Sequence, residues 1–432
     1  MTCKSCLKDH EQINVEMRRP SRGKRALDLI ISLALIVLSS PILVAGWFSS
    51  GRSFKRTTRV GYGRTLYEEL SFHTDHKLGG RILNRLHLAE LPVLLNVVKG
   101  DMSFIGPRPV SPDNIAAHGM EELTRYLVRP GLISPWWIRT RANIDYGTEL
   151  EADIEYVNHH GVGVDIGILM RAIPALFYGG RLPSRTEKVS MLGIPITNCS
   201  MNDAIEKISE WVRDSSPMQV CFVNADCANI AYKNDAYLAV LQDADLCLAD
   251  GIGIKLGAKI LGRDIVQNVN GTDMFPLLCE RLSGTYARVF LLGARPEAVE
   301  GCAAWIRERY PQVLVCGWQH GYFEPEKELE IIDSIKNSGT HLLLVAFGAP
   351  KQDLWISQHL EATGVKVATG VGGLFDFYSG RIPRAPLWMR EIGMEWLYRL
   401  IQEPGRLWKR YLIGNGLFLW RVFKERVFGK RS

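Results

Sequence analysis

The chain has 432 residues, enough for two or three domains, and its apolar share of 47% and charged share of 23% are those of ordinary globular proteins, which excludes a largely disordered chain. The net charge of +6 is unevenly distributed: residues 381–432 contain 12 Lys and Arg against 4 Asp and Glu, a local charge of +8 that leaves the remainder at about −2. A basic tail on a nearly neutral body indicates an acidic partner, such as phospholipid headgroups, nucleic acid or a phosphorylated substrate.

The cysteines are typical of a protein in a reducing compartment. They are nine in number and scattered, and Cys221, Cys247 and Cys316 stand in apolar runs, where a thiol behaves as a small hydrophobic side chain. Cys3 and Cys6 form a single Cys-x-x-Cys pair without a second pair downstream, whereas a zinc site needs four ligands. We therefore predict no metal site.

Residues 26–48 form an apolar segment that is long enough for a transmembrane helix. The basic residues before it place its N-terminal end in the cytoplasm, and no small-residue cleavage site follows, which argues against a signal peptide. Asp28 lies in its first turn, and Ser39-Ser40-Pro41 interrupts its middle, where proline removes a backbone donor. These residues leave two alternatives: a kinked spanning helix, or a broken helix that enters and leaves the membrane on the same side.

Residues 24–179 resemble the monotopic phosphoglycosyl transferases, the bacterial sugar transferase family. The resemblance rests on KRALDLIISLALIVLSSPILV, TRVGYG, ELPVLLNVVKGDMSFIGPRPV, VRPGLISPWW and the Asp153-x-x-Tyr156 spacing. It implies a re-entrant helix over 26–48. It also implies transfer of a phosphosugar from a UDP-sugar to polyprenyl phosphate by an Asp-Glu pair before Leu-Pro, in which the aspartate attacks phosphorus and the glutamate helps to hold Mg²⁺.

The chain departs from this family at the nucleophile. Ala89 occupies the aspartate position and Glu90 the glutamate position, and covalent catalysis needs a nucleophile that a methyl group cannot supply. The family's cationic Lys-Phe-Arg-Ser-Met segment is replaced by EELSF at 68–72, whose acidic pair would repel a diphosphate. We interpret this half as an inactive membrane platform, which needs no Mg²⁺. The alternatives are a bifunctional enzyme that uses Glu90 and Mg²⁺, and a non-catalytic assembly scaffold.

Beyond a polar stretch at 181–188, short apolar runs alternate with helical patterns. This alternation predicts a mainly parallel sheet with helices on both faces, whose ligands bind beyond the carboxyl ends of the strands. The predicted strands are 220–223, 246–249, 289–293, 313–316, 342–347 and 365–369, and the predicted helices include 202–213, 296–310 and 326–336. Polar residues and glycines collect after these strands, among them Asn224, Asp250, Gly293 and Gln352, although an Asp before a Gly is often a simple helix cap.

Residues 190–410 resemble the WecG/TagA/CpsF glycosyltransferase family. The matching segments, all in one order, are LGIPITN, VNADCANIAYKN, ADGIGIKLGAK, NVNGTDMF, VFLLGARP, FGAPKQD, GVGGLFDFYSG and RAPLWMREIGMEWLYRLIQEPGRLWKRY. The resemblance implies inverting transfer of a hexose or N-acetylhexosamine-type sugar from a UDP-sugar to a polyprenyl-diphosphate-linked sugar.

By position, the resemblance makes Asp250 the candidate general base, because an inverting transfer needs one carboxylate to accept the acceptor's proton. Asn224 and Gln352 would orient sugar or acceptor. The candidate nucleotide-sugar-binding residues are Gly251, Asn270, Asp273, Gly293, Arg384, Arg399 and Arg406, with the three arginines neutralising the leaving group in the absence of an Asp-x-Asp metal motif. Asn268 stands where the family often has Arg, which suggests a different donor sugar or a repositioned cation.

Taken together, the sequence predicts an α/β protein: a small, mostly helical membrane-associated domain with a re-entrant helix, followed by a Rossmann-like parallel-sheet domain with a basic helical appendage. The predicted limits are 1–23 for a cytosolic tail, 24–182 and 189–380 for the two domains and 381–432 for the appendage. Aromatic and basic residues alternate in the appendage, which is typical of helices at a bilayer surface, and no nucleic-acid fold accompanies it. We therefore predict membrane lipids as partners at the cytoplasmic face of a bacterial inner membrane, no nucleic acid, and leave a homo-oligomer open.

Overall fold

The computed structural model describes residues 21–74, 88–113, 120–142, 147–178, 187–213 and 216–429. The chain divides into two compact units, the first comprising Met1–Thr140 and Tyr146–Phe177 and the second Arg141–Asp145 and Tyr178–Ser432. The polar stretch at 181–188, where the sequence predicts a boundary, lies almost wholly outside the described residues, as do Cys3 and Cys6. The limits predicted for the N-terminal tail and the domains stay predictions.

The first unit combines helices with two small sheets. An antiparallel hairpin is formed by β1 (Phe54–Val60) and β2 (Leu66–Phe72), and a parallel pair by β3 (Ser103–Ile105) and β4 (Gly131–Ile133). The helices are α1 (Arg22–Ser49), α3 (Val93–Lys99), α4 (Pro135–Ala142), α5 (Glu149–His159) and α6 (Val162–Tyr178), with 3-10 turns at Tyr62–Arg64 and Met120–Leu127.

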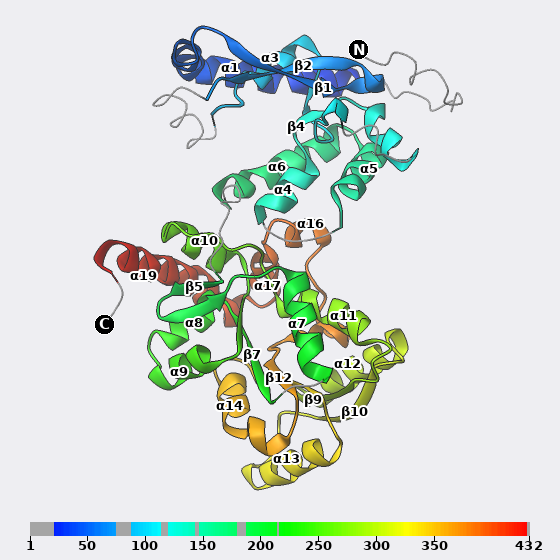
Figure 1. Cartoon of the computed structure of the whole chain (residues 1–432), viewed down its shortest axis with the longest axis vertical. Coiled ribbons are helices and arrows are strands. Elements are labelled where there is room, and N and C mark those ends of the chain that lie inside the picture. The colour runs from blue at the N-terminus through cyan, green and yellow to red at the C-terminus, as the bar shows by residue number, and fades with distance from the viewer. Residues whose placement is uncertain are drawn as a thin grey trace. The chain divides into compact units, whose positions relative to one another are not determined.

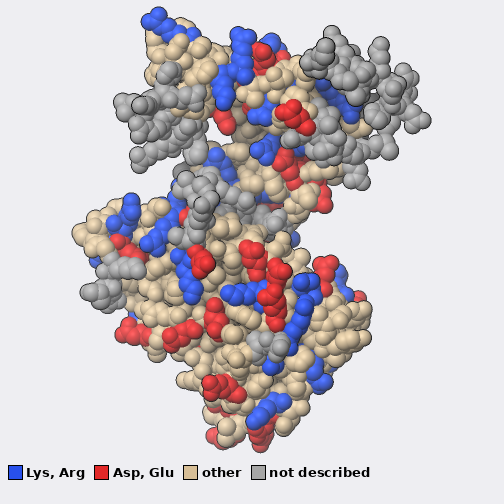
Figure 2. Space-filling view, in the orientation of Figure 1, with Lys and Arg blue, Asp and Glu red and all other residues tan. Residues whose placement is uncertain are grey.

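Helix α1 buries polar and small residues and exposes apolar ones, the inverse of a helix in a soluble domain. Its buried residues are Lys24, Asp28, Ser32 and Gly46. Its exposed large apolar residues are Ile30, Leu33, Leu35, Val37, Leu38, Ile42, Val44 and Phe48. From Leu29 to Ser49, α1 contains no charged residue, so this part of the helix contributes only uncharged surface, drawn tan in Figure 2. Within the described residues, α1 is the one helix that is long and apolar enough to cross a membrane, by length and composition.

Both ends of α1 pack against the same unit. At the N-terminal end, Arg25 donates to the carbonyl oxygens of Val97 and Val98 at the end of α3, each at 2.7 Å. At the C-terminal end, a Cβ on Gly46 would come within 2.6 Å of the Phe72 ring, so glycine allows the close approach. The helix continues through Pro41, whose nitrogen has no hydrogen to donate to the Val37 carbonyl four residues earlier. The Ser40 hydroxyl donates to this carbonyl instead, at 2.8 Å.

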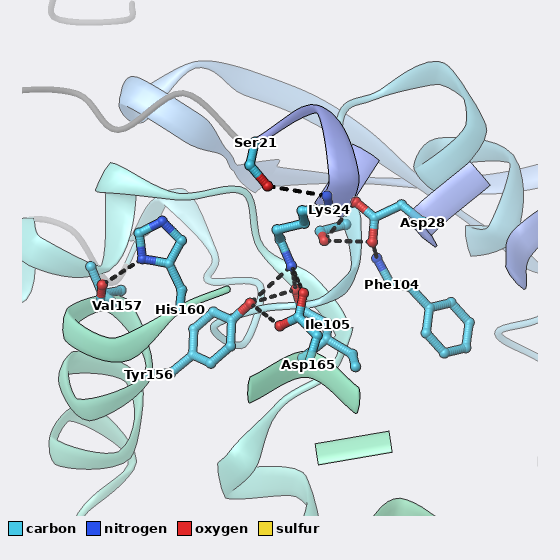
Figure 3. A network of polar contacts seen from close by, with 10 residues as sticks. Ser21, Lys24, Asp28, Phe104, Ile105, Tyr156, Val157, His160 and Asp165 are labelled. Carbon is cyan, nitrogen blue, oxygen red and sulfur yellow. Dashed lines mark hydrogen bonds and ion pairs between the residues drawn. The ribbon is translucent and has the colours of Figure 1, made fainter. Parts of the chain in front are cut away.

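A buried polar network fixes the start of α1 (Figure 3). The Lys24 ammonium forms an ion pair with Asp165 of α6 at 2.5 Å and donates to Tyr156 Oη and to the Ile105 carbonyl, both at 2.9 Å. One turn later, the Asp28 carboxylate accepts from the Ser103 hydroxyl and from the Phe104 backbone N–H, each at 2.9 Å. Lys24 and Asp28, whose charges are unfavourable inside a membrane, are therefore the attachment points of α1 to the globular part of the unit.

The second unit is built on a mixed eight-stranded sheet in the order β10-β9-β11-β12-β7-β8-β6-β5. All neighbouring strands are parallel except β5 and β6, which form an antiparallel hairpin. The strands are β5 (Lys188–Met191), β6 (Ile194–Thr197), β7 (Met218–Val223), β8 (Leu246–Ala249), β9 (Arg288–Gly293), β10 (Leu314–Gln319), β11 (Leu342–Ala346) and β12 (Val367–Gly370). All six predicted strands are present, with small shifts at their ends.

Helices cover both faces of this sheet, as predicted, because successive strand residues point to opposite sides (Figure 1). Val220 and Phe222 of β7 belong to a core on one side, and Cys221 and Val223 to a core on the other. The first side is covered by α7 (Met201–Arg213), α11 (Gly271–Leu282), α12 (Pro296–Arg309) and α15 (Leu374–Tyr378). The second is covered by α8 (Ala225–Ala231), α9 (Asp235–Asp243), α10 (Ile252–Ile260), α13 (Glu328–Asn337), α14 (Lys351–Thr363) and α19 (Gly414–Phe428).

The basic C-terminal segment is part of this unit rather than a free tail. It forms α16 (Leu387–Arg390), α17 (Glu395–Gln402), α18 (Pro404–Trp408), a π-helical turn at Lys409–Ile413, and α19. Phe418 and Val422 of α19 are fully buried in the core beneath α8 and α10. The opposite side of the segment exposes large apolar residues beside cations, namely Leu412, Ile413, Leu417, Trp420, Phe423 and Val427.

Candidate active site

The predicted general base lies where two neighbouring parallel strands end. Asp250 follows β8 directly, and Asn224 follows the adjacent strand β7. Asn224 is the N-cap of α8: its Oδ1 accepts from the backbone N–H groups of Asp226 and Cys227, both at 3.0 Å. This arrangement turns the amide nitrogen toward the carboxylate, and Nδ2 donates to Asp250 Oδ2 at 3.3 Å. The structure thus brings together two residues that are 26 positions apart.

The surroundings of Asp250 favour its neutral form. Burial raises the pKa of the Asp250 carboxyl above its ordinary value, the hydrogen bond from Asn224 lowers it, and the negative charge of Glu395 raises it further. Arg410 and Arg399 act in the opposite direction and lower the pKa. A carboxylate with a raised pKa is a stronger base, so this site is suited to accepting a proton.

Asn268 shapes the loop that follows Asp250. Its Oδ1 accepts from the Gly251 backbone N–H at 2.5 Å, and its side chain is buried. Gly251, directly before α10, has φ of +87°, and this backbone conformation favours glycine. Asn268, at the position where the family resemblance implies arginine, therefore has a structural partner of its own in this chain.

Gln352 joins two glycine-containing loops at the neighbouring strand ends. Its Oε1 accepts from the backbone N–H groups of Gly348, after β11, and of Gly372, after β12, both at 3.0 Å. The side chain is buried, so its oxygen positions these loops. Behind it, burial raises the pKa of Asp353 to about 6, and Tyr237 Oη donates to this carboxyl at 3.1 Å. The predicted contact of Gln352 with a substrate stays a prediction.

Asn270, Asp273 and Arg384 form a second polar group at the start of α11. Asn270 caps the helix by accepting from the Asp273 N–H at 2.8 Å, and its Nδ2 donates to Asp273 Oδ2 at 2.7 Å. Arg384 donates to Asp273 Oδ1 at 2.7 Å and forms an ion pair with Glu395 at 3.2 Å, and Arg390 lies 3.4 Å from the same Asp273 oxygen. Two carboxylates thus balance two guanidinium groups, which attach α16 and α17 to the start of α11.

The remaining predicted residues lie around these groups. Gly293 ends β9 with φ of +115°, and a Cβ there would come within 2.6 Å of the Ala346 carbonyl oxygen, so close packing against β11 by itself explains the glycine. The Arg399 guanidinium lies 5.3 Å from the centre of the Phe377 ring. Arg406 is exposed and pairs with Glu403. No observation tests the roles that the sequence predicts for these three residues.

Several site residues were not predicted from the sequence. Arg410, Arg390 and Glu395 come from the C-terminal segment, where basic residues are so frequent that none stands out. Asp226, two residues after Asn224, is a further such residue: its Oδ2 lies 3.1 Å from Arg410 Nε, across 184 positions of sequence. No spacing rule could have paired these two residues.

Ala89 and Glu90, the residues of the degenerate site that the sequence predicts, lie in a turn between β2 and α3. The Ala89 carbonyl accepts from the Phe72 N–H at 2.8 Å, and Glu90 is exposed. The acidic residues of the predicted degenerate segment have cross-strand partners, since Glu68 pairs with Arg56 at 3.0 Å and Glu69 with Arg59 at 2.5 Å. These carboxylates stabilise the β1–β2 hairpin.

The family model "Glycosyl transferase WecG/TagA/CpsF family" matches residues 189–432, which contain every element of the site around Asp250. The chain belongs to this family. A second family model, "Bacterial sugar transferase", matches residues 19–179. The enzyme is therefore a glycosyltransferase fused to a bacterial sugar transferase domain, and the domain and its apolar helix associate it with a membrane.

Three curated relatives bear the same name, N-acetylglucosaminyldiphosphoundecaprenol N-acetyl-beta-D-mannosaminyltransferase. The protein of Bacillus subtilis (strain 168) is 30% identical over 220 residues, which cover 51% of this glycosyltransferase and 85% of the relative. That of Bacillus spizizenii is 33% identical over 182 residues, which cover 42% of this glycosyltransferase and 70% of the relative. That of Staphylococcus aureus (strain MW2) is 29% identical over 247 residues, which cover 56% of this glycosyltransferase and 95% of the relative.

Proposed function

We propose that this enzyme transfers a hexose or N-acetylhexosamine-type sugar, with inversion, from a UDP-sugar to a polyprenyl-diphosphate-linked sugar in the synthesis of a bacterial surface polysaccharide. The names of the relatives support this acceptor class and an N-acetylmannosamine-type donor. The observation that carries the proposal is the Asp250 carboxylate at the end of β8, with a raised pKa and a hydrogen bond from Asn224.

In this proposal, Asp250 accepts the proton of the acceptor hydroxyl as its oxygen attacks the anomeric carbon and UDP departs. Asn224 holds the carboxylate, and Gln352 holds the loops after β11 and β12 that approach the donor. Cations from the C-terminal segment, with Arg384, Arg399 and Arg406 as the predicted members, neutralise the leaving diphosphate, so that this half needs no metal ion.

We further propose that the first unit is an inactive phosphoglycosyl transferase-like platform, held on the cytoplasmic side by a helix that stays in one leaflet. The segment from Lys24 to Gly46 spans roughly 33 Å at about 1.5 Å per residue, close to the thickness of the hydrocarbon core. Both ends of this span pack against one globular unit. A spanning α1 would therefore draw the charged β1–β2 hairpin into the bilayer, which costs several kcal/mol.

The product nucleotide tests this division of labour. The purified full-length enzyme would be incubated with a panel of UDP-sugars, including UDP-N-acetylmannosamine, and with either polyprenyl phosphate or polyprenyl-diphosphate-linked N-acetylglucosamine. We expect release of UDP that depends on the diphosphate-linked acceptor. Release of UMP with bare polyprenyl phosphate would mean that the first unit is active despite Ala89, and its loss in Glu90→Ala would identify the substitute nucleophile.

The exposed apolar side of the C-terminal segment is expected to contact the bilayer that contains the acceptor. Replacing Leu417 and Trp420 by glutamate removes two exposed apolar side chains of α19 and leaves the buried Phe418 in place. We expect the KM for a long-chain polyprenyl acceptor to rise at least about tenfold, because each apolar side chain contributes on the order of 1.5–3 kcal/mol when buried. The kcat/KM for a short-chain, water-soluble acceptor should not change.

The matched control places glutamate at Tyr322 and Leu329, two exposed apolar residues outside the C-terminal segment. This variant has the same change in charge and should behave as the wild type with both acceptors. Equal effects of the two double variants would mean that the apolar side of α19 has no special relation to the lipid.

A further inference from the structure

A buried carboxylate stands directly beside Gln352 and has no role in the proposed mechanism. Asp353, the next residue of α14, is only 1% exposed. Its Oδ2 accepts from Tyr237 Oη of α9 at 3.1 Å, and its backbone carbonyl accepts from Gln219 Nε2 of β7 at 2.9 Å. Two neighbouring elements therefore hold Asp353 in a fixed position.

The other carboxylate oxygen of Asp353 lies beside the amide nitrogen of Gln352. A Cβ on Gly370, the last residue of β12, would come within 2.4 Å of Gln352 Nε2 and within 2.6 Å of Asp353 Oδ1, so both atoms lie over the same Cα. The φ of Gly370 is not in the left-handed region that requires glycine. The space that these two atoms occupy is thus the structural reason for a glycine at this position.

The charge of Asp353 favours one of the two orientations of this amide. Burial raises the pKa of Asp353 to about 6, so the carboxylate form predominates at neutral pH. The side chains of Tyr237, Cys221 and Gln352 act in the opposite direction and favour this charged form. Within the described residues, no donor is well aligned with Oδ1. A buried charged oxygen without an aligned donor is stabilised by the positive end of the adjacent amide, which is Nε2.

The loops at the candidate site need the same orientation. Gln352 Oε1 accepts from the backbone N–H groups of Gly348 and Gly372, both at 3.0 Å. If the amide were rotated by half a turn, Nε2 would face these two N–H groups and Oε1 would face the Asp353 carboxylate. Donors would then meet donors and acceptors would meet an acceptor. The carboxylate and the two loops therefore select one and the same orientation.

We propose that Asp353 is a positioning residue for sugar transfer, because its Oδ1 holds the Gln352 amide in the orientation that fixes the loops after β11 and β12. Its effect on catalysis rests on the proposed function, in which these loops approach the donor. Its effect on the order of the two loops does not depend on the identity of any substrate.

The test exchanges donor and acceptor in the full-length enzyme. Asp353→Asn keeps the size of the side chain, and the Tyr237 hydroxyl keeps the remaining oxygen on its own side, so the new NH2 group meets Gln352 Nε2. Gln352→Glu keeps an acceptor for both loops and places a second oxygen against Asp353. The two substitutions together restore a donor opposite an acceptor. The matched control is Asp245→Asn, because Asp245 also accepts a backbone N–H, that of Gln219 at 2.8 Å, but at the amino ends of the strands.

Hydrogen–deuterium exchange of the segments around Gly348 and Gly372 is the first readout, because it needs no turnover. We expect each single variant to exchange roughly five- to tenfold faster there, which corresponds to the loss of about one hydrogen bond. The double variant should return toward the wild-type rate, and Asp245→Asn should leave both segments unchanged. The Tm of Asp353→Asn should stay within about 3 °C of the wild type, because a neutral amide avoids the cost of burying a charge.

In the transfer assay, Asp353→Asn should raise the KM for the UDP-sugar roughly 3- to 10-fold, with a smaller change in kcat. Should this variant unfold, Gly370→Ala replaces it, because the added methyl group displaces Nε2 and Oδ1 and should speed exchange in the same loops.

Wild-type loop exchange in Asp353→Asn, or a double variant that adds the two single effects, would overturn the inference. Faster loop exchange with an unchanged KM would confine Asp353 to the fold and overturn its role in transfer. If the wild type transfers no sugar, the proposed function fails, while the exchange rates still decide whether Asp353 orients Gln352.

Discussion

Replacing Asp250 by asparagine is expected to lower kcat by about 10²- to 10⁴-fold, the range that general acid–base catalysis contributes. The substitution keeps the size of the side chain, and the new amide oxygen can still accept from Asn224 Nδ2, so the ends of β7 and β8 should keep their arrangement. The measurement is the rate of UDP release with the diphosphate-linked acceptor, alongside calorimetric binding of UDP. We expect the rate to fall and the affinity for UDP to stay within about twofold of the wild type.

The pH dependence separates loss of a base from a loss of structure. Because only the carboxylate form accepts a proton, kcat/KM should fall as the pH is lowered through the raised pKa of Asp250. In the wild type, the hydrogen bond from Asn224 lowers the pKa of Asp250. Asn224→Ser keeps an acceptor for the helix cap but removes the amide that donates this hydrogen bond. The acidic limb of the profile should therefore move to higher pH in Asn224→Ser. An unchanged profile, or full activity in Asp250→Asn, would mean that another group is the base.

Replacing Lys24 by methionine is expected to lower the free energy of unfolding of the first unit by roughly 3–5 kcal/mol, because it leaves the Asp165 carboxylate buried without its cation. The exposed fractions of the two side chains are 4% for Lys24 and 1% for Asp165. The Tyr156 hydroxyl continues to donate to Asp165 at 2.8 Å, which reduces but does not abolish the penalty. The measurement is thermal or denaturant unfolding of the full-length protein in detergent, in which the transition of the first unit should shift and that of the second should not.

Two further variants make this test specific. Arg56→Met breaks the Arg56–Glu68 ion pair, whose side chains are 69% and 56% exposed, and should change stability by less than about 1 kcal/mol. Lys24→Met combined with Asp165→Leu removes both charges and should cost less than Lys24→Met alone. Equal effects of Lys24→Met and Arg56→Met would contradict a role of the buried network in fixing the start of α1.

The outline of the second unit could be predicted from the sequence, because strand and helix formation there depends on local periodicity. Apolar runs of four to six residues located all six predicted strands. The sequence analysis did not predict the β5–β6 hairpin. Its turn has Leu192 at φ of +50° and Gly193 at φ of +84°, and a glycine between two short apolar runs is a local indication of such a turn. Asn224 and Asp250 could be placed at one edge of the sheet for a related reason, since the carboxyl ends of parallel strands meet there, and the order of the strands then decided that the two residues are neighbours.

The sequence by itself determined the positions of six strands of the second unit, the presence of one apolar helix, the absence of an aspartate at position 89, and the strand-end location of Asp250. The tertiary structure decided which distant groups meet: Lys24 with Asp165, Arg410 with Asp226, and α19 with the core beneath α8 and α10. The physical reason is that periodicity and strand-end chemistry act over a few residues. A buried ion pair, by contrast, depends on which surfaces pack together, and this is fixed only when the whole core forms.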